Sequence, residues 1–236
     1  MTVRTVFFDL GGTLVVMRRD IVIRNILGDE GYKIPTSRIH DAYYISEKDW
    51  LKKYGTKIMN EEQAIKAYSE LNMSILSNLG LSISKEELER LKKIVSERYL
   101  EVESSIKPRL YPDSLPTLSE LRKKGYKIGI ISNAPPSTIE SVKKLGLDKF
   151  ADPILISGIV GFTKPNPELF RLALRLSDTK PEEAVHVGDI YEADIRGARS
   201  VGMKGVLIDR EGRLQDPNYL IKIRSLKELP ALLLKL

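Results

Sequence analysis

Apolar positions follow two different spacings along the chain, and the change between them divides it into regions. Residues 5–8 (TVFF) form a short run that ends at Asp9, and two glycines follow almost at once. Such a run predicts a buried strand closed by a tight turn. From about Met17 to Ser105 the apolar residues recur every three to four positions, whereas from Lys107 onward short apolar runs alternate with that spacing. The pattern predicts a helical region placed within a region of alternating strands and helices.

The helical region is predicted to contain four helices. They lie near 20–27 and 36–53, and over 60–79 and 84–100. Asn60 and Gly80 bound the third helix as N-cap and terminator, and Ser84 with Glu87 predicts a capping box at the fourth. These signals predict an all-helical insert.

The rest of the chain alternates between strands and helices. Strands are predicted over 126–132, 153–157, 184–189 and 204–209. Helices are predicted over 114–124, 137–146, 166–176, 192–202 and 225–236, the last opening with a second capping box of Ser225 and Glu228. Repeated strand–helix–strand units predict an α/β fold, with a Rossmann-like parallel sheet covered by helices on both faces. We therefore expect a core of residues 1–16 and 106–236 and a helical insert of residues 17–105.

Composition narrows the class of protein. Hydrophobic residues make up 42% of the 236 positions and charged residues 30%, which fits a globular protein with a real core. No apolar run reaches bilayer length and the first strand starts almost at Met1, so we expect no membrane span, no signal peptide and a cytoplasmic location. Cysteine is absent and His40 and His186 are the two histidines, which excludes disulfides and cysteine nucleophiles and disfavours a zinc site.

The charge balance is mildly basic, with a net charge of +6. Because the basic residues are scattered among acids, we expect no nucleic-acid partner. A weak positive field suits a small anionic substrate instead. Scarce glutamine beside abundant Lys, Glu and Arg favours a thermophilic source, and the sequence leaves the oligomeric state open.

Polar residues stand where the predicted strands end. They are Asp9, Ser132, Asn133, Asp189 with Asp194 five residues later, and Lys164 in a proline-bounded loop. The carboxyl ends of parallel strands meet at one edge of a sheet, so we expect these side chains to converge. Helix capping and surface exposure are the ordinary alternatives for Ser132, Asn133, Lys164 and Asp194. An acid directly after a buried strand is costly without a partner, and two acids, a lysine and a hydroxyl would suit Mg²⁺ and phosphate.

Four segments in order, FFDLGGTLV, IISN, GFTKPNPELF and HVGDIYEAD, resemble the motifs of the haloacid dehalogenase-like hydrolase superfamily, most of whose members are phosphatases. The resemblance covers the whole chain, including a helical cap inserted after the first motif. It implies that Asp9 is a nucleophile that forms an aspartyl-phosphate intermediate. It also implies that Asp9, Asp189 and the backbone carbonyl of Gly11 hold Mg²⁺, with Asp194 supporting the metal through water or Lys164.

The same resemblance assigns the phosphate ligands. Ser132 would hydrogen-bond the phosphoryl oxygens, together with backbone N–H groups near Leu10 and Asn133. Lys164 would bridge the nucleophile and the phosphate and offset their repulsion. These roles suit phosphoryl transfer to an enzyme carboxylate, where catalysis is mostly positioning and charge stabilisation.

Gly11 departs from the family pattern. Phosphatases of this superfamily usually carry a second Asp at this position, which protonates the leaving group and then deprotonates water. Without it, we expect a substrate whose leaving group needs little protonation, or a substitute from water or the cap. The substitutes considered are His40, Asp20, Glu47 and Asp49. A phosphate-binding relative with little turnover is the next alternative, and a metal-independent 2-haloacid dehalogenase is the third.

Two further features of the helical region are interpreted as ordinary structure. Arg18 and Arg19 follow the first motif closely enough to contact an anionic substrate, but a solvated linker is the simpler interpretation. The segment 43–54 contains the aromatic residues Tyr43, Tyr44, Trp50 and Tyr54. Their helical spacing favours core packing over a ligand pocket.

Overall fold

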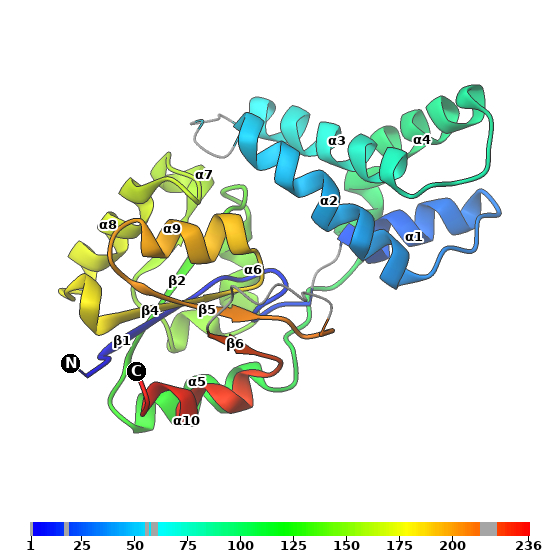
Figure 1. Ribbon diagram of the computed structural model, residues 1–236. Coiled ribbons are helices and arrows are strands. Elements are labelled where there is room, and N and C mark those ends of the chain that lie inside the picture. Colours follow the sequence, from blue (N-terminus) through cyan, green and yellow to red (C-terminus); the bar gives the residue numbers. More distant parts are fainter. Residues whose placement is uncertain (1, 17–18, 55–56, 58–60, 213–220) are drawn as a thin grey trace. The chain divides into compact units, whose positions relative to one another are not determined.

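The computed structural model describes residues 2–16, 19–54, 57, 61–212 and 221–236 (Figure 1). The described residues fall into two compact units. One unit, the α/β unit, contains residues 2–16, 57, 109–212 and 221–236. The other, the helical unit, contains residues 19–54 and 61–108. Within the described parts of the chain, no helix has both the length and the apolar character needed to cross a membrane.

The α/β unit is built on a parallel sheet. Its strands are β1 (Thr5–Phe8), β2 (Lys127–Ser132), β3 (Ile154–Ile156), β4 (Ala184–Gly188), β5 (Lys204–Ile208) and β6 (Lys222–Ile223). They lie in the order β3-β2-β1-β4-β5-β6, and every pair is parallel. The first strand of the chain is therefore central, between β2 and β4, and the α/β prediction is confirmed.

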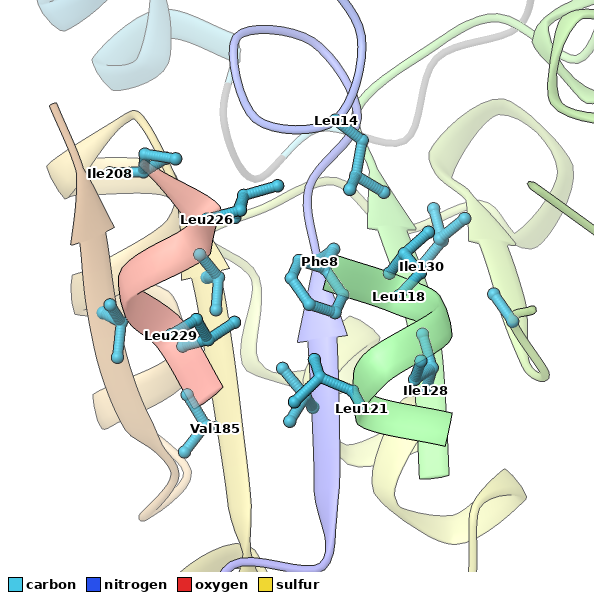
Figure 2. Packing of buried hydrophobic residues seen from close by; sticks show 14 of the residues in the cluster. Phe8, Leu14, Leu118, Leu121, Ile128, Ile130, Val185, Ile208, Leu226 and Leu229 are labelled. Atoms are coloured by element: carbon cyan, nitrogen blue, oxygen red, sulfur yellow. The ribbon is translucent and has the colours of Figure 1, made fainter. Parts of the chain in front are cut away.

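Helices cover both faces of the sheet because both faces of its strands are apolar. The longer helices are α5 (Ser114–Lys123), α6 (Thr138–Lys144), α8 (Pro167–Leu176) and α10 (Leu229–Leu233). In β1, Phe8 contributes to the core shared with α5, α6 and α10, whereas Phe7 contributes to the core shared with α8. Figure 2 shows Leu118 and Leu121 of α5 and Leu229 of α10 beside Phe8. Side-chain alternation along the strand thus fixes β1 in the centre of the sheet.

The helical unit consists of α1 (Arg19–Asp29), α2 (Thr36–Tyr54), α3 (Glu61–Asn78) and α4 (Lys85–Ser105). These elements match the predicted helices, although the proposed N-cap of α3, Asn60, lies outside the described residues. Each helix buries apolar side chains at helical spacing, such as Ile23 and Ile26 in α1. The indole Nε1–H of Trp50 donates to the Ala67 carbonyl at 2.7 Å and joins α2 to α3.

Several local predictions are corrected. Ser84 accepts from the Glu87 backbone N–H at 3.2 Å, but the Glu87 carboxylate bonds to Tyr32 and Arg90 instead of completing a capping box. Ser225 and Glu228 do form their capping box, at the short helix η4 (Leu226–Glu228) that precedes α10. The sequence also missed α7 (Ser157–Val160) and β6, because both are too short to carry a period.

The predicted helix over 192–202 begins differently from an α-helix. A π-helical turn, η3 (Tyr191–Ile195), comes first, and α9 (Arg196–Arg199) follows it. The carboxylate of Asp194 accepts a hydrogen bond from the Ile190 N–H at 3.0 Å, so its side chain turns back towards the end of β4. Single π turns of this kind often occur where a side chain serves a site.

Candidate functional site

Two of the predicted acids follow neighbouring strands of the sheet. Asp9 comes directly after β1 and Asp189 directly after β4, and both are buried. The Asp9 N–H donates to the Val187 carbonyl at 2.9 Å, which continues the β1–β4 pairing up to the acid. Asp194 is fully buried in η3. One carboxylate oxygen from each of the three acids lies within 4.8 Å of those from the other two.

Lys164 joins two of these acids. Its Nζ lies 2.5 Å from Oδ1 of Asp9 and 2.6 Å from Oδ1 of Asp194. The lysine side chain is 3% exposed, which sets it apart from the ordinary surface lysine considered above. The structure therefore brings Asp9, Asp189, Asp194 and Lys164 together, and we call these four residues the site cluster.

The electrostatics of the site cluster favour an ionised Asp9 beside a protonated Lys164. Burial, opposed by Lys164 and reinforced by the charge of Asp194, raises the pKa of Asp9 to about 6. Burial also acts against charge on Asp194, but Lys164 and His186 outweigh it and hold the pKa of that carboxyl well below its usual value. The pKa of Lys164 is raised because Asp194 and Asp9 outweigh the effect of its burial. At neutral pH all three groups are charged.

Two glycines leave room for the acids. A Cβ atom at Gly12 would lie 2.2 Å from Oδ2 of Asp189, and the Gly12 backbone has a positive φ of +77°. A Cβ at Gly188 would lie 2.1 Å from the carboxyl carbon of Asp194. Both positions therefore require glycine, because any side chain would overlap a carboxylate. Gly12 thus leaves space for the Asp189 carboxylate, and Gly188 leaves space for that of Asp194.

The donor set of the site cluster fits a hard divalent cation. Three carboxylates and one lysine leave a surplus of negative charge in a buried position. A buried surplus of charge is costly unless a cation or a proton neutralises it. Carboxylate oxygens are the protein ligands that Mg²⁺ prefers, usually few in number and completed by water and substrate.

Ser132 is the last residue of β2, the other neighbour of β1, and Asn133 follows it. Ser132 is buried at the strand end, and no side-chain hydrogen bond to another described residue occupies its hydroxyl. Asn133 acts on Lys164: its Oδ1 accepts from the Lys164 N–H at 2.7 Å and its Nδ2 donates to the Lys164 carbonyl at 2.9 Å. The Asn133 side chain thus fixes the backbone of the lysine loop, which sequence reasoning missed.

His186 is a further residue that sequence reasoning missed. It lies in β4 and its Nε2 is 2.9 Å from Oδ1 of Asp194. Burial lowers the pKa of His186, against the opposing effect of Asp194, so the ring is neutral at pH 7. The signal in the sequence was a single polar side chain inside the apolar run AVHVG.

Gly11, the position of the unusual glycine, is open. A Cβ atom built there meets no other atom within 4 Å. The absence of a side chain at Gly11 is therefore not imposed by crowding, unlike that at Gly12.

The substitutes proposed for the missing acid lie in the helical unit. Glu47 is buried and accepts a hydrogen bond from Tyr43 Oη at 2.6 Å, whereas Asp49 is exposed and pairs with Lys52. Asp20 accepts from the Ile21 N–H at 2.8 Å, near the start of α1. The fourth substitute, His40, packs its ring against Tyr43 and Tyr44.

The linker interpretation of Arg19 is wrong, and Arg18 lies outside the described residues. Arg19 begins α1, and its guanidinium lies 5.2–6.0 Å from the ring centroids of Tyr43, Tyr68 and Tyr99. It also donates to Asn72 Oδ1 at 2.5 Å. Of the predicted packing aromatics, Trp50 stacks on Tyr68, as a core position would.

Comparisons with a family model and with known proteins indicate the same family. The family model for haloacid dehalogenase-like hydrolases matches residues 3–202. A glyceraldehyde 3-phosphate phosphatase of Methanopyrus kandleri is 45% identical over 107 residues, which are 45% of this chain and 46% of that protein. The chain thus aligns with less than half the length of this relative. The pyrophosphatase PpaX of Bacillus cereus is 31% identical over 205 residues, covering 86% of this chain and 82% of that protein.

Solved structures agree on the fold. The crystal structure of a HAD phosphatase from Thermococcus onnurineus superposes with a TM-score of 0.59 at 26% identity, covering 98% of this chain and 97% of that one.

Proposed function

The chain belongs to the haloacid dehalogenase-like hydrolases, and from that premise we propose that it hydrolyses a small phosphorylated metabolite through a covalent intermediate on Asp9, with Mg²⁺ bound by the site cluster. The observation that carries the proposal is the contact of 2.5 Å between Lys164 Nζ and Asp9 Oδ1 in a buried cluster that holds three acids. Lys164 contacts both Asp9 and Asp194 but carries one positive charge, so the three acids keep a surplus of negative charge that a metal would balance.

The reaction we propose has two displacements at phosphorus. A carboxylate oxygen of Asp9 attacks the phosphorus, the bond from phosphorus to the leaving oxygen breaks, and the alcohol departs with a proton from water. A second water then attacks the same phosphorus and gives a proton to the hydroxide left by the first water, the bond to Asp9 breaks, and inorganic phosphate leaves with Asp9 restored. The sum is one ester and one water converted to one alcohol and one phosphate.

The residues of the site have distinct tasks in this proposal. Lys164 neutralises part of the charge that builds up between Asp9 and the phosphoryl group, and Ser132 Oγ donates to a phosphoryl oxygen. Asn133 holds the lysine loop in register, and its backbone N–H is a proposed phosphate ligand. Mg²⁺, held by Asp9, Asp189 and the Gly11 carbonyl, would supply charge stabilisation for the anionic substrate. Asp194 keeps Lys164 in place.

Gly11 restricts the class of substrate. A general acid typically accelerates such a step about 10²–10⁴-fold, and no side chain at Gly11 can provide it. Substrates whose leaving group is stable as an anion lose least, which favours acyl, aryl and anomeric sugar phosphates. Pyrophosphate belongs to the same class because its leaving group is phosphate, and a pyrophosphatase is the named relative that aligns over 86% of this chain.

We also infer that the helical unit, which follows the first motif in the chain, serves as a cap that supplies substrate contacts and excludes water. Arg19, which lies among tyrosine rings, is the described basic residue of α1 that is nearest in sequence to Asp9.

The test is release of p-nitrophenol from p-nitrophenyl phosphate with Mg²⁺, with EDTA, and in the Asp9→Asn variant. The aryl leaving group needs little protonation, so Gly11 should matter least for this compound. Asp209→Asn is the matched control, because Asp209 is a buried acid directly after β5 that pairs with Lys222 and stands outside the site cluster.

Turnover that needs both Mg²⁺ and Asp9, and survives in Asp209→Asn, supports the proposal. Phosphate binding without turnover in a folded protein would instead identify a phosphate-binding relative. Metal-independent release of chloride from 2-chloropropionate would identify a dehalogenase.

A further inference from the structure

His186 is a polar residue on a strand face that is otherwise apolar. It is fully buried in the middle of β4, and its neighbours across the sheet are Phe7 of β1 and Gly205 of β5. Its ring meets Phe170 of α8 edge-on, with ring centroids 5.3 Å apart. Aliphatic side chains are the usual occupants of such positions, so the imidazole calls for an explanation other than packing.

The imidazole continues a chain of hydrogen bonds that ends at Asp9. Its Nε2 lies 2.9 Å from Oδ1 of Asp194, and the same oxygen receives Lys164 Nζ at 2.6 Å. Lys164 Nζ in turn reaches Oδ1 of Asp9 at 2.5 Å. The order is therefore His186, Asp194, Lys164 and Asp9.

The direction of the first bond follows from the charge of Asp194. An ionised carboxylate only accepts, so Nε2 must carry the hydrogen and Nδ1 must be the unprotonated acceptor. The Nδ1 atom is buried and has no hydrogen-bond partner among the described residues. An unsatisfied buried acceptor is destabilising. A residue kept for packing would not carry this cost, which points to the Nε2–H donor as the reason for the histidine.

We propose that His186 is a positioning residue for Lys164: its Nε2–H fixes Oδ1 of Asp194 in the orientation that directs Lys164 at Asp9. The inference rests on the proposed function, in which Lys164 must stand between the nucleophile and the phosphate. The other carboxylate oxygen of Asp194 is held by the Ile190 N–H, and Gly188 packs against the carboxyl carbon. His186 thus supplies the remaining restraint on the carboxylate. Without His186, Lys164 would be the one side-chain donor to Oδ1 among the described residues.

The experiment compares His186→Leu, which removes the donor and puts an apolar side chain in its place, with His186→Gln, which can place an amide N–H near the former Nε2. Val206→Ala on β5 is the control for loss of core packing, since Val206 is fully buried and outside the hydrogen-bond chain. For p-nitrophenyl phosphate with Mg²⁺, we expect kcat of His186→Leu to fall about 10-fold or more, as for other outer partners of charged site groups. KM should change much less, and His186→Gln should recover most of kcat.

A second readout is independent of turnover. The chain has two histidines, so ring ¹H–¹⁵N spectra with His40→Gln as reference assign the His186 signals directly. We expect the Nε2–H tautomer in the wild type, and a shifted or broadened Lys164 ammonium signal in His186→Leu but not in Val206→Ala.

Two results would overturn the proposal. One is wild-type kcat and an unchanged Lys164 signal in folded His186→Leu. The other is an equal loss of kcat in His186→Leu, His186→Gln and Val206→Ala that tracks their melting temperatures, because this would mean packing alone. If the wild type shows no turnover that depends on Mg²⁺ and Asp9, the proposed function fails, while the tautomer and the Lys164 signal still decide the role of His186.

Discussion

Two clusters of buried and half-buried charged side chains flank the loop that carries Gly11 and Gly12, and they differ in their balance of charge. The site cluster holds Asp9, Asp189 and Asp194 against Lys164. The second cluster, which we call the anchor cluster, pairs Asp113 at the start of α5 with Arg210 after β5. The first has more acids than bases, whereas the second has one of each.

The anchor cluster is closed by its own hydrogen bonds. Arg210 donates to both carboxylate oxygens of Asp113, at 3.0 and 3.1 Å, and also to the carbonyls of Gly12 and Thr13. Asp113 accepts further bonds from the Ser225 hydroxyl at 2.8 Å and the Leu226 N–H at 2.9 Å. Bidentate pairs with this many partners lock geometry. The anchor cluster therefore fixes the loop on which the site cluster depends.

The contrast shows that the balance of acids and bases distinguishes a cluster that stabilises the fold from one that can bind a ligand. A closed pair with filled acceptors needs nothing from outside the protein. A buried surplus of carboxylates is tolerated when a ligand or metal completes it, and clusters of this type are candidates for function. The comparison predicts that changes in the site cluster alter turnover and metal dependence, whereas changes at Asp113 in the anchor cluster alter stability much more than turnover.

The largest effect is expected from removing the single cation of the site cluster. Lys164→Met leaves buried Asp9 and Asp194 without their partner, so we expect a loss of about 3–5 kcal/mol of unfolding free energy in EDTA. Turnover should be abolished. Calorimetry with and without Mg²⁺ should show that the metal stabilises this variant more than the wild type, because it replaces the missing positive charge.

Lys222→Met is the matched control for that experiment. Lys222 pairs with Asp209 at 3.4 Å and its side chain is 29% exposed, so its loss should cost about 0–1 kcal/mol. If both variants lost equal stability and neither responded to Mg²⁺, the site cluster would hold no special surplus of charge.

Most of the fold could be predicted from the sequence because the longer helices and strands bury apolar residues at regular spacing. The helices of the helical unit and the long strands all follow a period of 3.6 or a continuous apolar run. The turn at η3 was not predictable in this way, since residues 192–202 have an ordinary helical pattern. Its shape depends on the Asp194 carboxylate bonding to Ile190, which is a consequence of the site.

The candidate site was predictable where residues follow strand ends, as Asp9 and Asp189 do. The roles of Asn133 and Arg210 were not, because each depends on contacts with residues distant in sequence. Arg210 and Gly12, for example, are 198 positions apart. Arg210 carries no local pattern that distinguishes it from any other basic residue near a strand end. The role of His186 was not predictable either, because it depends on the π turn that brings Asp194, eight residues later, back to β4.

A smaller effect on turnover is expected from Gly11→Asp, which adds an acid to the site cluster. A Cβ atom at Gly11 meets no atom of another residue within 4 Å apart from its chain neighbours, so the side chain can start there without a clash. A carboxyl group there can protonate an alkoxide leaving group, so kcat on alkyl phosphates should rise about 10-fold or more. Steady-state rates on an alkyl phosphate and on p-nitrophenyl phosphate measure this, and the aryl ester should gain less.

Gly11→Ala separates the acid from the added bulk in that experiment, and it should leave the rate on both esters near the wild-type value. An unchanged alkyl phosphate rate in Gly11→Asp that still folds and binds metal would mean that the missing acid does not limit turnover.

The smallest effect on turnover is expected in the anchor cluster. Asp113→Asn puts an amide NH₂ against the Arg210 and Leu226 donors, so the unfolding free energy should fall by about 1–3 kcal/mol. At a temperature where the variant is folded, kcat on p-nitrophenyl phosphate should stay within about threefold of wild type, because within the described part of the chain the hydrogen bonds from Asp113 to the loop run through Arg210. A much larger loss of kcat would show that the two clusters are coupled.

The same variant tests the acid sensitivity of the anchor cluster. Burial acts to raise the pKa of Asp113, but hydrogen bonds from Arg210 and Ser225 outweigh it, so the pKa of Asp113 lies below its usual value of 3.8. A carboxyl with a lowered pKa in the folded state stabilises the protein above its unfolded-state pKa. That stability is lost as the pH falls through the lower, folded-state value. Denaturant titrations from pH 5 to pH 2 should therefore show a smaller fall for Asp113→Asn than for the wild type, and parallel curves would mean that Asp113 keeps its ordinary pKa.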